Sequence, residues 1–452
     1  MKINIPRIVI AGTHSNVGKT TIICALARYF NKKGIRTKVF KCGPDYLDPT
    51  YHQRASGSSS VNLDSWMMGT NSVLSTFYNA SKDYDLALIE GVMGLYDGLS
   101  PTNEAGSTAE ISKILGAPVV LVCDASGMAR SIAALVNGFK GFDKELHFGG
   151  VLCNRVGSAG HLDLLKRAIQ ETTVFGGVTK GNMHFPSRHL GLTTASKEMI
   201  SEEVFDYWEN KISEHVDTNA LLDLAKEAKE KEAPVALSQN EQKKCVIAYA
   251  HDDAFHFYYE ENFNLLKNMG AELIPFSPLK DSKLPENIDG ILIGGGYPEV
   301  HAKELSENKS MIEDIKKFKG PIYGECGGLM YLSEGIITLD NKTYPMLGLL
   351  KGQAKMENKL QALGYVEVEL KDSTIIGPKG LRFRGHQFRY STLESAQENP
   401  LVFSLRKRRN KAVSKEGYKN DRILGSYVHA HFGSNHLLAK HFIESCLGEY
   451  GH

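Results

Sequence analysis

Cys326 is the residue of this sequence best placed to act as a nucleophile. It lies in the stretch Tyr323-Gly324-Glu325-Cys326-Gly327-Gly328-Leu329, with a glycine two residues to either side. This G-x-C-x-G spacing is typical of a nucleophile on a sharp strand-to-helix turn, where the backbone is strained and larger neighbours would collide. A helix beginning at Gly327 would direct its N-terminal amides at the sulfur and favour the thiolate. The plainer alternative is a buried cysteine beside a glycine-rich turn.

Two other stretches supply the partners that such a nucleophile needs. An apolar strand leads into the loop Gly294-Gly295-Gly296, whose bare amides, together with that of Gly327, could hold a developing oxyanion. Residues 423–432 are expected to form one strand, in which alternate positions place His429 and His431 on the same face. One of these histidines could accept the proton of the thiol.

This set of a cysteine, a later histidine and a glycine loop resembles the class I glutamine amidotransferase domain. In that family a Cys–His pair hydrolyses glutamine to glutamate and ammonia, which implies Cys326 and His429 as the pair here. The family's histidine is usually followed two residues later by a glutamate that orients it, whereas this sequence has His431. The third member therefore stays open. The same departure resembles the cobyrinic and cobyric acid synthase branch, where the acid is commonly missing.

The stretch from Gly12 to Thr21 has the composition of a phosphate-binding loop. A β-branched run precedes it and an apolar helical segment, Ile22 to Phe30, follows it. Loop amides and the helix terminus would bind phosphate oxygens, Lys19 would neutralise the β- and γ-phosphates, and the Thr20 hydroxyl could bind Mg²⁺. The expected nucleotide contacts in this loop are Gly12, Thr13, Asn16, Val17, Gly18, Lys19, Thr20 and Thr21.

Acidic residues follow the next two expected strands. Asp45 and Asp48 lie in a loop that two prolines and a glycine should keep out of regular structure, and Glu90 ends an apolar strand in the manner of a Walker-B acid. Ligands bind at the carboxyl ends of the strands in open α/β sheets. We therefore expect Thr20, Asp45 and Glu90 to converge on one Mg²⁺, the alternative being a surface turn with capping aspartates.

Strands and helices alternate along both halves of the chain. In the first half, further strand-like runs at 117–123 and 150–154 alternate with helical segments, which predicts a doubly wound parallel sheet. The segment from Leu224 to Pro234 is rich in charged residues and is expected to form a helix that runs into a linker. The prediction is therefore an α/β protein of two domains, 1–235 and 243–452.

The composition favours small-molecule partners. The chain has 452 residues, too many for one ordinary core, and its 53 basic and 52 acidic residues create no field to attract nucleic acid or a membrane. Its seven cysteines are widely spaced without a C-x-x-C pair, as expected of reduced thiols in a cytosol. No signal peptide opens the sequence, and no apolar run approaches the roughly 20 residues of a membrane helix. We expect a cytoplasmic protein.

Over almost its whole length the chain resembles the cobyrinic acid a,c-diamide synthase family. The stretches that carry the resemblance are 43–49, 90–98, 188–192, 325–332 and 384–388, although Gln387 replaces the family's glutamate. The resemblance implies a ligase that uses ATP, Mg²⁺ and glutamine to amidate the a- and c-acetate carboxylates of cobyrinate in cobalamin biosynthesis. A homodimer stays open as its state of assembly.

The resemblance also implies roles for single residues. The candidates for binding the macrocycle and its acetate groups are Tyr46, Leu47, Asp48 and Asp97. The spacing of the phosphate loop resembles that of dethiobiotin synthetase and its relatives, in which an asparagine at a strand end contacts adenine. This implies adenine binding by Asn154, for which an ordinary turn residue is the alternative. Arg188 is a candidate phosphate contact.

In the implied reaction, ATP converts a carboxylate into an acyl phosphate, and ammonia then displaces phosphate. Ammonia is mostly protonated near neutral pH and then not nucleophilic, so we expect the two domains to face each other. One alternative is the nickel-sirohydrochlorin a,c-diamide synthase of coenzyme F430 biosynthesis. The others are a nucleotide-switch ATPase with a non-catalytic C-terminal binding domain, and a dethiobiotin-like ligase that uses carbon dioxide.

Overall fold

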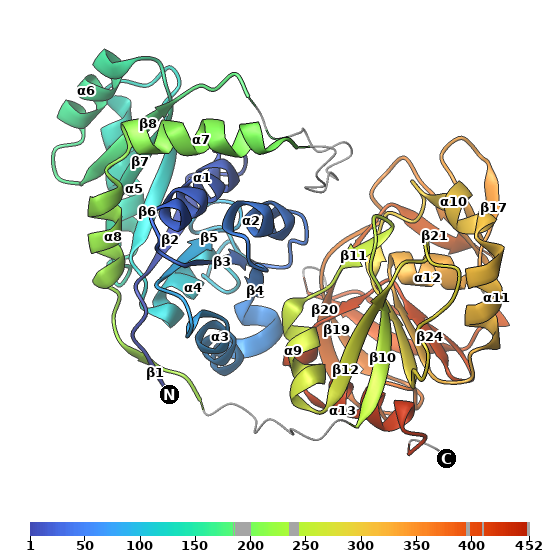
Figure 1. Cartoon of the computed structure of the whole chain (residues 1–452). Coiled ribbons are helices and arrows are strands. Elements are labelled where there is room, and N and C mark those ends of the chain that lie inside the picture. The colour runs from blue at the N-terminus through green and yellow to red at the C-terminus, as the bar shows by residue number, and fades with distance from the viewer. Residues whose placement is uncertain (184, 186–199, 235–243, 395–397, 409–410, 450–452) are drawn as a thin grey trace. The chain divides into compact units, whose positions relative to one another are not determined.

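The structure is a computed structural model of the chain and describes residues 1–183, 185, 200–234, 244–394, 398–408 and 411–449. Its contacts divide the chain into two compact units, Met1–Ala236 and Leu237–His452. Both units combine a sheet with helices, which confirms the predicted α/β class (Figure 1). Among the described residues, no helix is both long and apolar enough to cross a membrane.

A parallel sheet forms the centre of the N-terminal unit. In the described part it has seven strands in the order β4-β3-β5-β2-β6-β7-β8. These strands are β2 (Arg7–Gly12), β3 (Thr37–Cys42), β4 (Val61–Leu63), β5 (Leu86–Glu90), β6 (Val119–Asp124), β7 (Phe148–Val156) and β8 (Val174–Thr179). The order runs outwards in both directions from β2, so the carboxyl end of β2 lies at the topological switch point, where ligands bind in such sheets.

Helices follow most of these strands. They are α1 (Lys19–Lys32), α2 (Asp48–Ser56), α3 (Ser65–Ser81), α4 (Thr108–Leu115), α5 (Ser131–Phe142), α6 (Ala159–Ala168), α7 (Glu202–His215) and α8 (Thr218–Lys226). One apolar core joins α1, α7 and α8 to alternate residues of the strands, such as Ile8 and Ile10 of β2. The alternation arises because successive strand residues point to opposite faces.

Two segments of this unit differ from their sequence prediction. The charged helix expected to reach Pro234 ends at Lys226, and Lys231–Glu232 forms β9, which pairs with β1 (Lys2–Ile3). The pairing of Lys231 and Glu232 with β1 outweighs the helix propensity of this charged segment. The loop expected to be irregular through both aspartates instead enters α2 at Asp48, since Pro49 suits the first turn of a helix.

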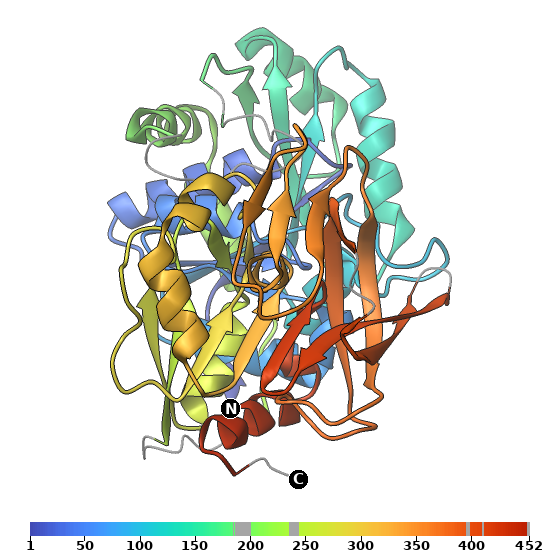
Figure 2. The same cartoon turned by 90° about the vertical axis from the view of Figure 1, so that its right-hand side faces the viewer.

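A mixed sheet forms the centre of the C-terminal unit. In the described part it has ten strands in the order β12-β10-β13-β15-β24-β23-β22-β19-β20-β25, parallel as far as β24 and antiparallel beyond it. The parallel strands are β10 (Cys245–Ala250), β12 (Ala271–Phe276), β13 (Gly290–Ile293), β15 (Ile322–Glu325) and β24 (Ile423–Ser426). The others are β19 (Ala362–Leu370), β20 (Arg382–Arg389), β22 (Leu401–Lys407), β23 (Val413–Asn420) and β25 (His429–Ala430). Figure 2 shows these antiparallel strands in orange and red.

Smaller elements complete this unit. Two short strands, β11 (Phe255–Phe257) and β14 (Gly295–Gly296), pair with each other. A small second sheet contains β16 (Gly335–Ile337), β17 (Thr343–Pro345), β18 (Gln353–Met356) and β21 (Ser391–Glu394). The helices are α9 (Glu260–Asn268), α10 (Ala302–Glu307), α11 (Lys309–Lys317), α12 (Gly327–Leu332) and α13 (Leu437–Cys446).

The single strand predicted over residues 423–432 is wrong. β24 ends at Ser426 because the Tyr427 N–H donates to the buried Glu416 carboxylate, at 2.6 Å, and the Ser426 hydroxyl donates to the same carboxylate. The chain then joins β20 as the short strand β25, in which His429 lies opposite His386. His431 lies beyond this strand, so the two histidines do not share a strand face.

Candidate active site

The loop between β2 and α1 has the backbone geometry of an anion cradle. Asn16 and Gly18 have positive φ angles of 64° and 101°, which turn the chain sharply into the helix. No side chain in the described part caps the N-terminus of α1, so its first amides are open to a ligand. Gly12 allows a close approach, since a Cβ there would lie 2.5 Å from Val17 Cγ1. These features support the predicted phosphate loop.

Lys19 points its ammonium group into this cradle. It donates hydrogen bonds to the carbonyl oxygens of Met93 (2.6 Å) and His14 (3.3 Å). Burial lowers the pKa of Lys19 to about 8, with a further contribution from Lys41. A phosphate group would supply the anionic partner that this buried cation requires.

Other predicted loop residues fix the shape of the cradle. The Thr13 N–H donates to the carbonyl of Val122 on β6 at 3.2 Å, and Thr21 lies half-buried in the first turn of α1. β7 continues two residues past the strand end predicted at Asn154, and the Asn154 amide donates to the Val17 carbonyl at 2.8 Å. Asn154 therefore holds the phosphate loop in this structure, and its contact with adenine stays a prediction.

A buried polar cluster surrounds Glu90 at the end of β5. One carboxylate oxygen accepts a hydrogen bond from Thr20 Oγ1 (2.7 Å) and lies 2.9 Å from Lys41 Nζ. The other lies 2.5 Å from His52 Nε2, and Lys41 also contacts the Asp48 carboxylate at 2.5 Å. Burial opposes ionisation of Glu90, but Lys41 and the contact with His52 together outweigh it, so the pKa of Glu90 is lowered and the group is a carboxylate.

The same cluster was expected to hold Mg²⁺. Thr20 and Glu90 offer oxygen ligands of the kind that Mg²⁺ prefers, side by side at the phosphate loop, so they fit such a cation. Asp45 instead accepts the backbone N–H of Leu47 at 2.8 Å. Among the described residues, no group of three or more His, Cys, Asp or Glu side chains is arranged to hold a metal. The three-residue site with Asp45 stays a prediction.

The four residues expected to bind the macrocycle have different environments. Leu47 and Asp48 are buried, at 6% and 4% exposure, and Asp48 is paired with Lys41. Tyr46 is half-buried, and Asp97 is exposed and accepts the backbone N–H of Gly94 at 3.0 Å. Only Tyr46 and Asp97 of this set therefore offer surface to a large ligand. Arg188 lies outside the described residues.

Cys326 occupies the predicted elbow between β15 and α12. Its φ and ψ angles of 50° and −101° are strained for a residue other than glycine, as expected of a nucleophile at such a turn. Its N–H donates to the carbonyl of Ser426 on β24 at 2.7 Å, and its sulfur lies 3.9 Å from the Phe388 carbonyl oxygen. Helix α12 begins at Gly327, as predicted.

The helix terminus at Gly327 has less effect on the pKa of the Cys326 thiol than burial has. Burial raises the pKa of the Cys326 thiol to about 12, and Glu299 adds to the rise. Arg389 and the Gly327 N–H act in the opposite direction without reversing it. The Gly327 amide thus favours the thiolate in the expected direction, but the residue is only 9% exposed and dehydration of the anion outweighs the helix terminus. A base has to remove the proton when substrate binds.

The short strand β14 joins the cysteine to the candidate base, His429. A Cβ on Gly295 would lie 2.5 Å from His429 Cε1, and one on Gly327 would lie 3.1 Å from the backbone nitrogen of Gly296. One strand edge therefore touches both the imidazole and the turn that carries Cys326. Burial lowers the pKa of His429 to about 3, with His386 adding to the effect, so the ring is neutral and able to accept a proton.

The predicted oxyanion donors lie in this same region. The Gly327 N–H faces the Cys326 sulfur, where it lowers the thiol pKa. Gly295 and Gly296 pair with Phe257 and Phe255 of β11, which fixes the strand beside His429. Which amides bind an oxyanion stays a prediction.

His431 does not stand in for the missing acid. It is fully buried against Tyr259, with ring centroids 4.8 Å apart, and within the described residues neither ring nitrogen makes a hydrogen bond. Asn262 of α9 fixes the backbone on both sides of it, donating to the Ala430 carbonyl (2.8 Å) and accepting from the Phe432 N–H (2.7 Å). The carboxyl group near His429 belongs instead to Glu325, whose Oε2 lies 4.0 Å from His429 Nδ1.

Comparison with known proteins places this geometry in a family. The CobQ/CobB/MinD/ParA nucleotide binding domain matches residues 8–184, and the CobB/CobQ-like glutamine amidotransferase domain matches residues 246–437. A cobyrinate a,c-diamide synthase of Leptospira interrogans is 53% identical over 453 residues, covering 99% of this chain and 100% of the relative. The chain belongs to the cobyrinate a,c-diamide synthase family. Enzymes of the same name from Priestia megaterium (40% identity, 97% of both chains) and Methanococcus maripaludis (42%, 96% of this chain and 98% of the relative) agree.

Membership of the cobyrinate a,c-diamide synthase family settles the class of protein. A nucleotide-binding domain joined to a glutamine amidotransferase domain makes the chain a glutamine-dependent amidotransferase ligase, as predicted. Within this frame, sequence reasoning missed Lys41 and Glu325. Both are charged residues at or next to the carboxyl end of a fully buried strand, and that was the available signal.

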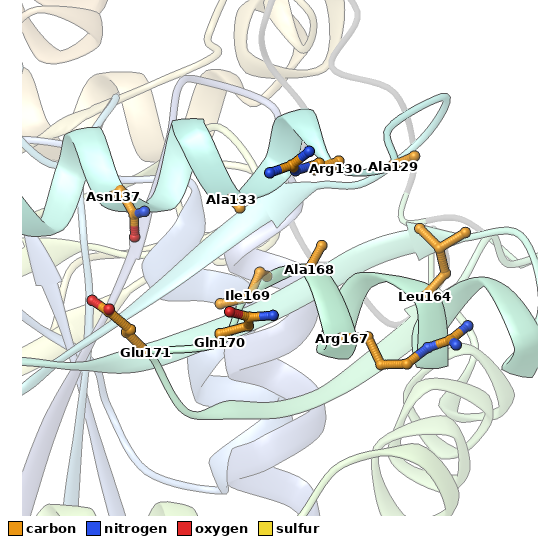
Figure 3. Close-up of a pocket in the computed structure, with 10 residues that line it drawn as sticks. All are labelled: Ala129, Arg130, Ala133, Asn137, Leu164, Arg167, Ala168, Ile169, Gln170 and Glu171. Atoms are coloured by element: carbon orange, nitrogen blue, oxygen red, sulfur yellow. The ribbon is translucent and has the colours of Figure 1, made fainter.

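One groove on the N-terminal unit lies apart from these residues. It has a volume of about 600 Å³ and runs between α5 and α6, as Figure 3 shows, with Arg130 on one side and Arg167 on the other. None of the predicted nucleotide or metal contacts lines it. We assign it no role in the ligase reaction.

Proposed function

We propose that this chain amidates the a- and c-acetate carboxylates of cobyrinate, in cobalamin biosynthesis, with ATP and glutamine as co-substrates. The observation that carries the proposal is the match over essentially the full length, at 53% identity, to a relative named cobyrinate a,c-diamide synthase. The geometry of both candidate sites fits the two half-reactions that such a ligase needs.

The N-terminal unit activates the carboxylate. The phosphate loop and Lys19 bind the triphosphate, and Thr20 and Glu90 would hold Mg²⁺, which spreads the charge of the transferred phosphoryl group. A carboxylate oxygen of the macrocycle attacks the γ-phosphorus, the bond from phosphorus to the bridging oxygen breaks, and ADP leaves. The acyl phosphate that forms has phosphate as its leaving group, which ammonia can displace.

The C-terminal unit supplies the ammonia. Cys326 loses its proton to His429 and adds to the carbonyl carbon of the glutamine side chain. Backbone amides near Gly327 stabilise the oxyanion, and His429 returns the proton to the departing ammonia. Water then hydrolyses the glutamyl thioester and restores Cys326. Ammonia released in this way serves the acyl phosphate, and the expectation that the two sites face each other stays a prediction.

A substrate panel tests the identity of the macrocycle. The purified chain is given ATP, Mg²⁺ and glutamine with cobyrinate, hydrogenobyrinate or nickel-sirohydrochlorin, and amidated products are identified by mass spectrometry. We expect two amidations of cobyrinate and a much lower kcat/KM for nickel-sirohydrochlorin. Preference for nickel-sirohydrochlorin would transfer the proposal to the F430 enzyme. Glutamate release without amidation of any macrocycle would overturn the substrate assignment.

Magnesium titration tests the proposed cation ligands. Glu90→Gln removes a carboxylate that touches Thr20, whereas Asp45→Asn changes a side chain that orders the turn at Leu47. We expect Glu90→Gln to raise the Mg²⁺ concentration for half-maximal ATP turnover more than Asp45→Asn does. Unchanged Mg²⁺ dependence in Glu90→Gln would remove Glu90 from the site.

A further inference from the structure

Glu325 lies at the junction of the nucleophile and the base. It is the last residue of β15, directly before Cys326, and is only 6% exposed. Its Oε1 accepts hydrogen bonds from the Tyr323 hydroxyl (2.8 Å) and from the N–H of Ala430, the residue after His429 (3.1 Å). Both bonds use the same oxygen and fix the carboxyl group. They leave Oε2 directed at the imidazole, 4.0 Å from His429 Nδ1.

The bond between Glu325 and Ala430 also fixes the backbone that carries the imidazole. β25 is a two-residue strand, so its position depends on its neighbours more than that of a long strand does. The Ala430 N–H donates to the Glu325 carboxylate, and the Ala430 carbonyl accepts from the Asn262 side chain. The hydrogen bond from the Ala430 N–H to the Glu325 carboxylate therefore helps to fix the distance between this carboxylate and His429.

We propose that Glu325 is the positioning residue for His429: its carboxylate holds the Nδ1–H of the ring and stabilises the imidazolium, in place of the acid that His431 replaces. This rests on the proposed function. The separation of 4.0 Å exceeds a hydrogen bond by about 1 Å, and such bonds are often long until substrate binds. His431 cannot take this role, because it is buried against Tyr259 beyond the strand.

The proton balance follows from this assignment. With Nδ1–H directed at Glu325, the other ring nitrogen carries the lone pair that accepts the Cys326 proton. The imidazolium then lies between a thiolate and a carboxylate, which offsets the burial that keeps His429 neutral at rest. Its proton leaves with ammonia, and Glu325 is a carboxylate before and after. No further oxidant, reductant or proton donor is needed.

The groups around Glu325 set the pH range of this role. Burial raises the pKa of Glu325 to about 7, although Tyr323 and the Ala430 amide oppose the rise. Among the described residues, other titratable groups near this pair are Cys326, Tyr258, His386 and Glu416, the last of which acts on Tyr323. Protonation of Glu325 removes the acceptor for Nδ1–H, so glutamine hydrolysis should decline as the pH falls through about 7.

The test variant is Glu325→Gln, which keeps an oxygen to accept from Tyr323 and Ala430 and removes the charge. The matched control is Glu416→Gln, since Glu416 is equally buried and also accepts from a hydroxyl and a backbone amide, at 2.6 Å each. We expect kcat for glutamate release to fall about 10²-fold in Glu325→Gln with little change in KM, and to fall far less in Glu416→Gln. Glu325→Asp should restore part of the loss.

Two further measurements separate positioning from folding. The acidic limb of the pH profile should be present in the unmodified chain and in Glu416→Gln, and absent in Glu325→Gln. Amidation with ammonium salts should stay within twofold of the unmodified chain in all variants. Equal losses in Glu325→Gln and Glu416→Gln, or an unchanged kcat and pH limb in Glu325→Gln, would overturn the inference.

Failure of the proposed function has a different signature. If the unmodified chain released no glutamate from glutamine under any condition, the glutaminase assignment would fall, and this inference with it. If the unmodified chain is an active glutaminase and Glu325→Gln matches it, only the inference falls.

Discussion

The ammonium group of Lys41 lies 2.9 Å from the Glu90 carboxylate, and both side chains are almost fully buried in the N-terminal unit. Removing one partner of a buried ion pair leaves an uncompensated charge. We expect Lys41→Met to lower the free energy of unfolding by about 3–5 kcal/mol. Both tryptophans, Trp66 and Trp208, lie in this unit, so urea unfolding followed by tryptophan fluorescence reports on it.

The control for Lys41 is an exposed ion pair in the same unit. Arg36 and Asp85 lie 2.9 Å apart with side chains 65% and 44% exposed, and such pairs contribute at most about 1 kcal/mol. We expect Arg36→Met to change stability by less than that. Similar effects of both substitutions would contradict the importance of the buried cluster.

Lys19 should bind a proton when it binds a nucleotide. Its pKa is lowered to about 8 by burial and by Lys41, so near pH 8 about half of the ligand-free chain carries a neutral amine at this position. A polyphosphate raises that pKa and draws a proton from the buffer. Calorimetry of ATP binding in buffers of different ionisation enthalpy should show uptake of about half a proton at pH 8 and less at pH 7.

Lys19→Arg provides the comparison for this measurement, because arginine keeps its charge at these pH values. The titration of ATP itself is common to both proteins and cancels. Equal proton uptake by the two would place the titrating group elsewhere than Lys19.

Gly295→Ala should disable the glutaminase alone. The new Cβ would lie 2.5 Å from His429 Cε1, too close for any atom pair, so the imidazole or strand β14 has to move. We expect glutamate release to fall at least about 10²-fold, with ammonium-dependent amidation retained. Gly138→Ala, in open space on α5, should alter neither activity. If Gly295→Ala kept its glutaminase activity, the position of His429 would not depend on the contact with Gly295.

Glu325 should make the C-terminal unit less stable at neutral pH than at acidic pH. Its folded pKa of about 7 lies above the ordinary value of 4.5, so the folded state binds the proton more tightly. The free energy of unfolding is therefore highest below pH 4.5 and falls as the pH rises towards 7. Glu325→Gln removes this dependence and should gain about 3 kcal/mol on the unmodified chain between pH 4.5 and 8.

Hydrogen exchange of residues 322–332, measured by mass spectrometry at both pH values, would report this change locally. Glu299 also has a pKa raised to about 7 by burial, but it is present in both proteins and cancels. An exchange difference that does not change with pH would show that Glu325 is not the titrating group.

The elements that local sequence controls were predictable. The β-branched run before Gly12 forms β2, and the glycines around Cys326 form the expected turn, because both depend on neighbours in the chain. The doubly wound sheet followed from the alternation of such runs. Each of these predictions depends only on the backbone conformation that a short segment prefers.

The pairings between distant segments were not predictable in this way. His431 occupies the sequence position of the family's acid. However, β24 ends where the Tyr427 N–H binds Glu416, so His431 does not share a strand face with His429. The pairing of Asp48 with Lys41 was not predicted, because nothing in the local sequence shows that the two side chains will meet. Burial of Cys326 likewise outweighs the helix terminus, and burial depends on the whole unit.

The division of labour between the two units has one direct test, the substitution Cys326→Ala. Amidation of cobyrinate is measured with ATP and Mg²⁺, once with glutamine and once with an ammonium salt at a pH that provides free ammonia. We predict that the glutamine-dependent rate falls at least about 10³-fold and that the ammonium-dependent rate stays within twofold of the unmodified chain. Loss of both rates, or survival of the glutamine-dependent rate, would contradict the account.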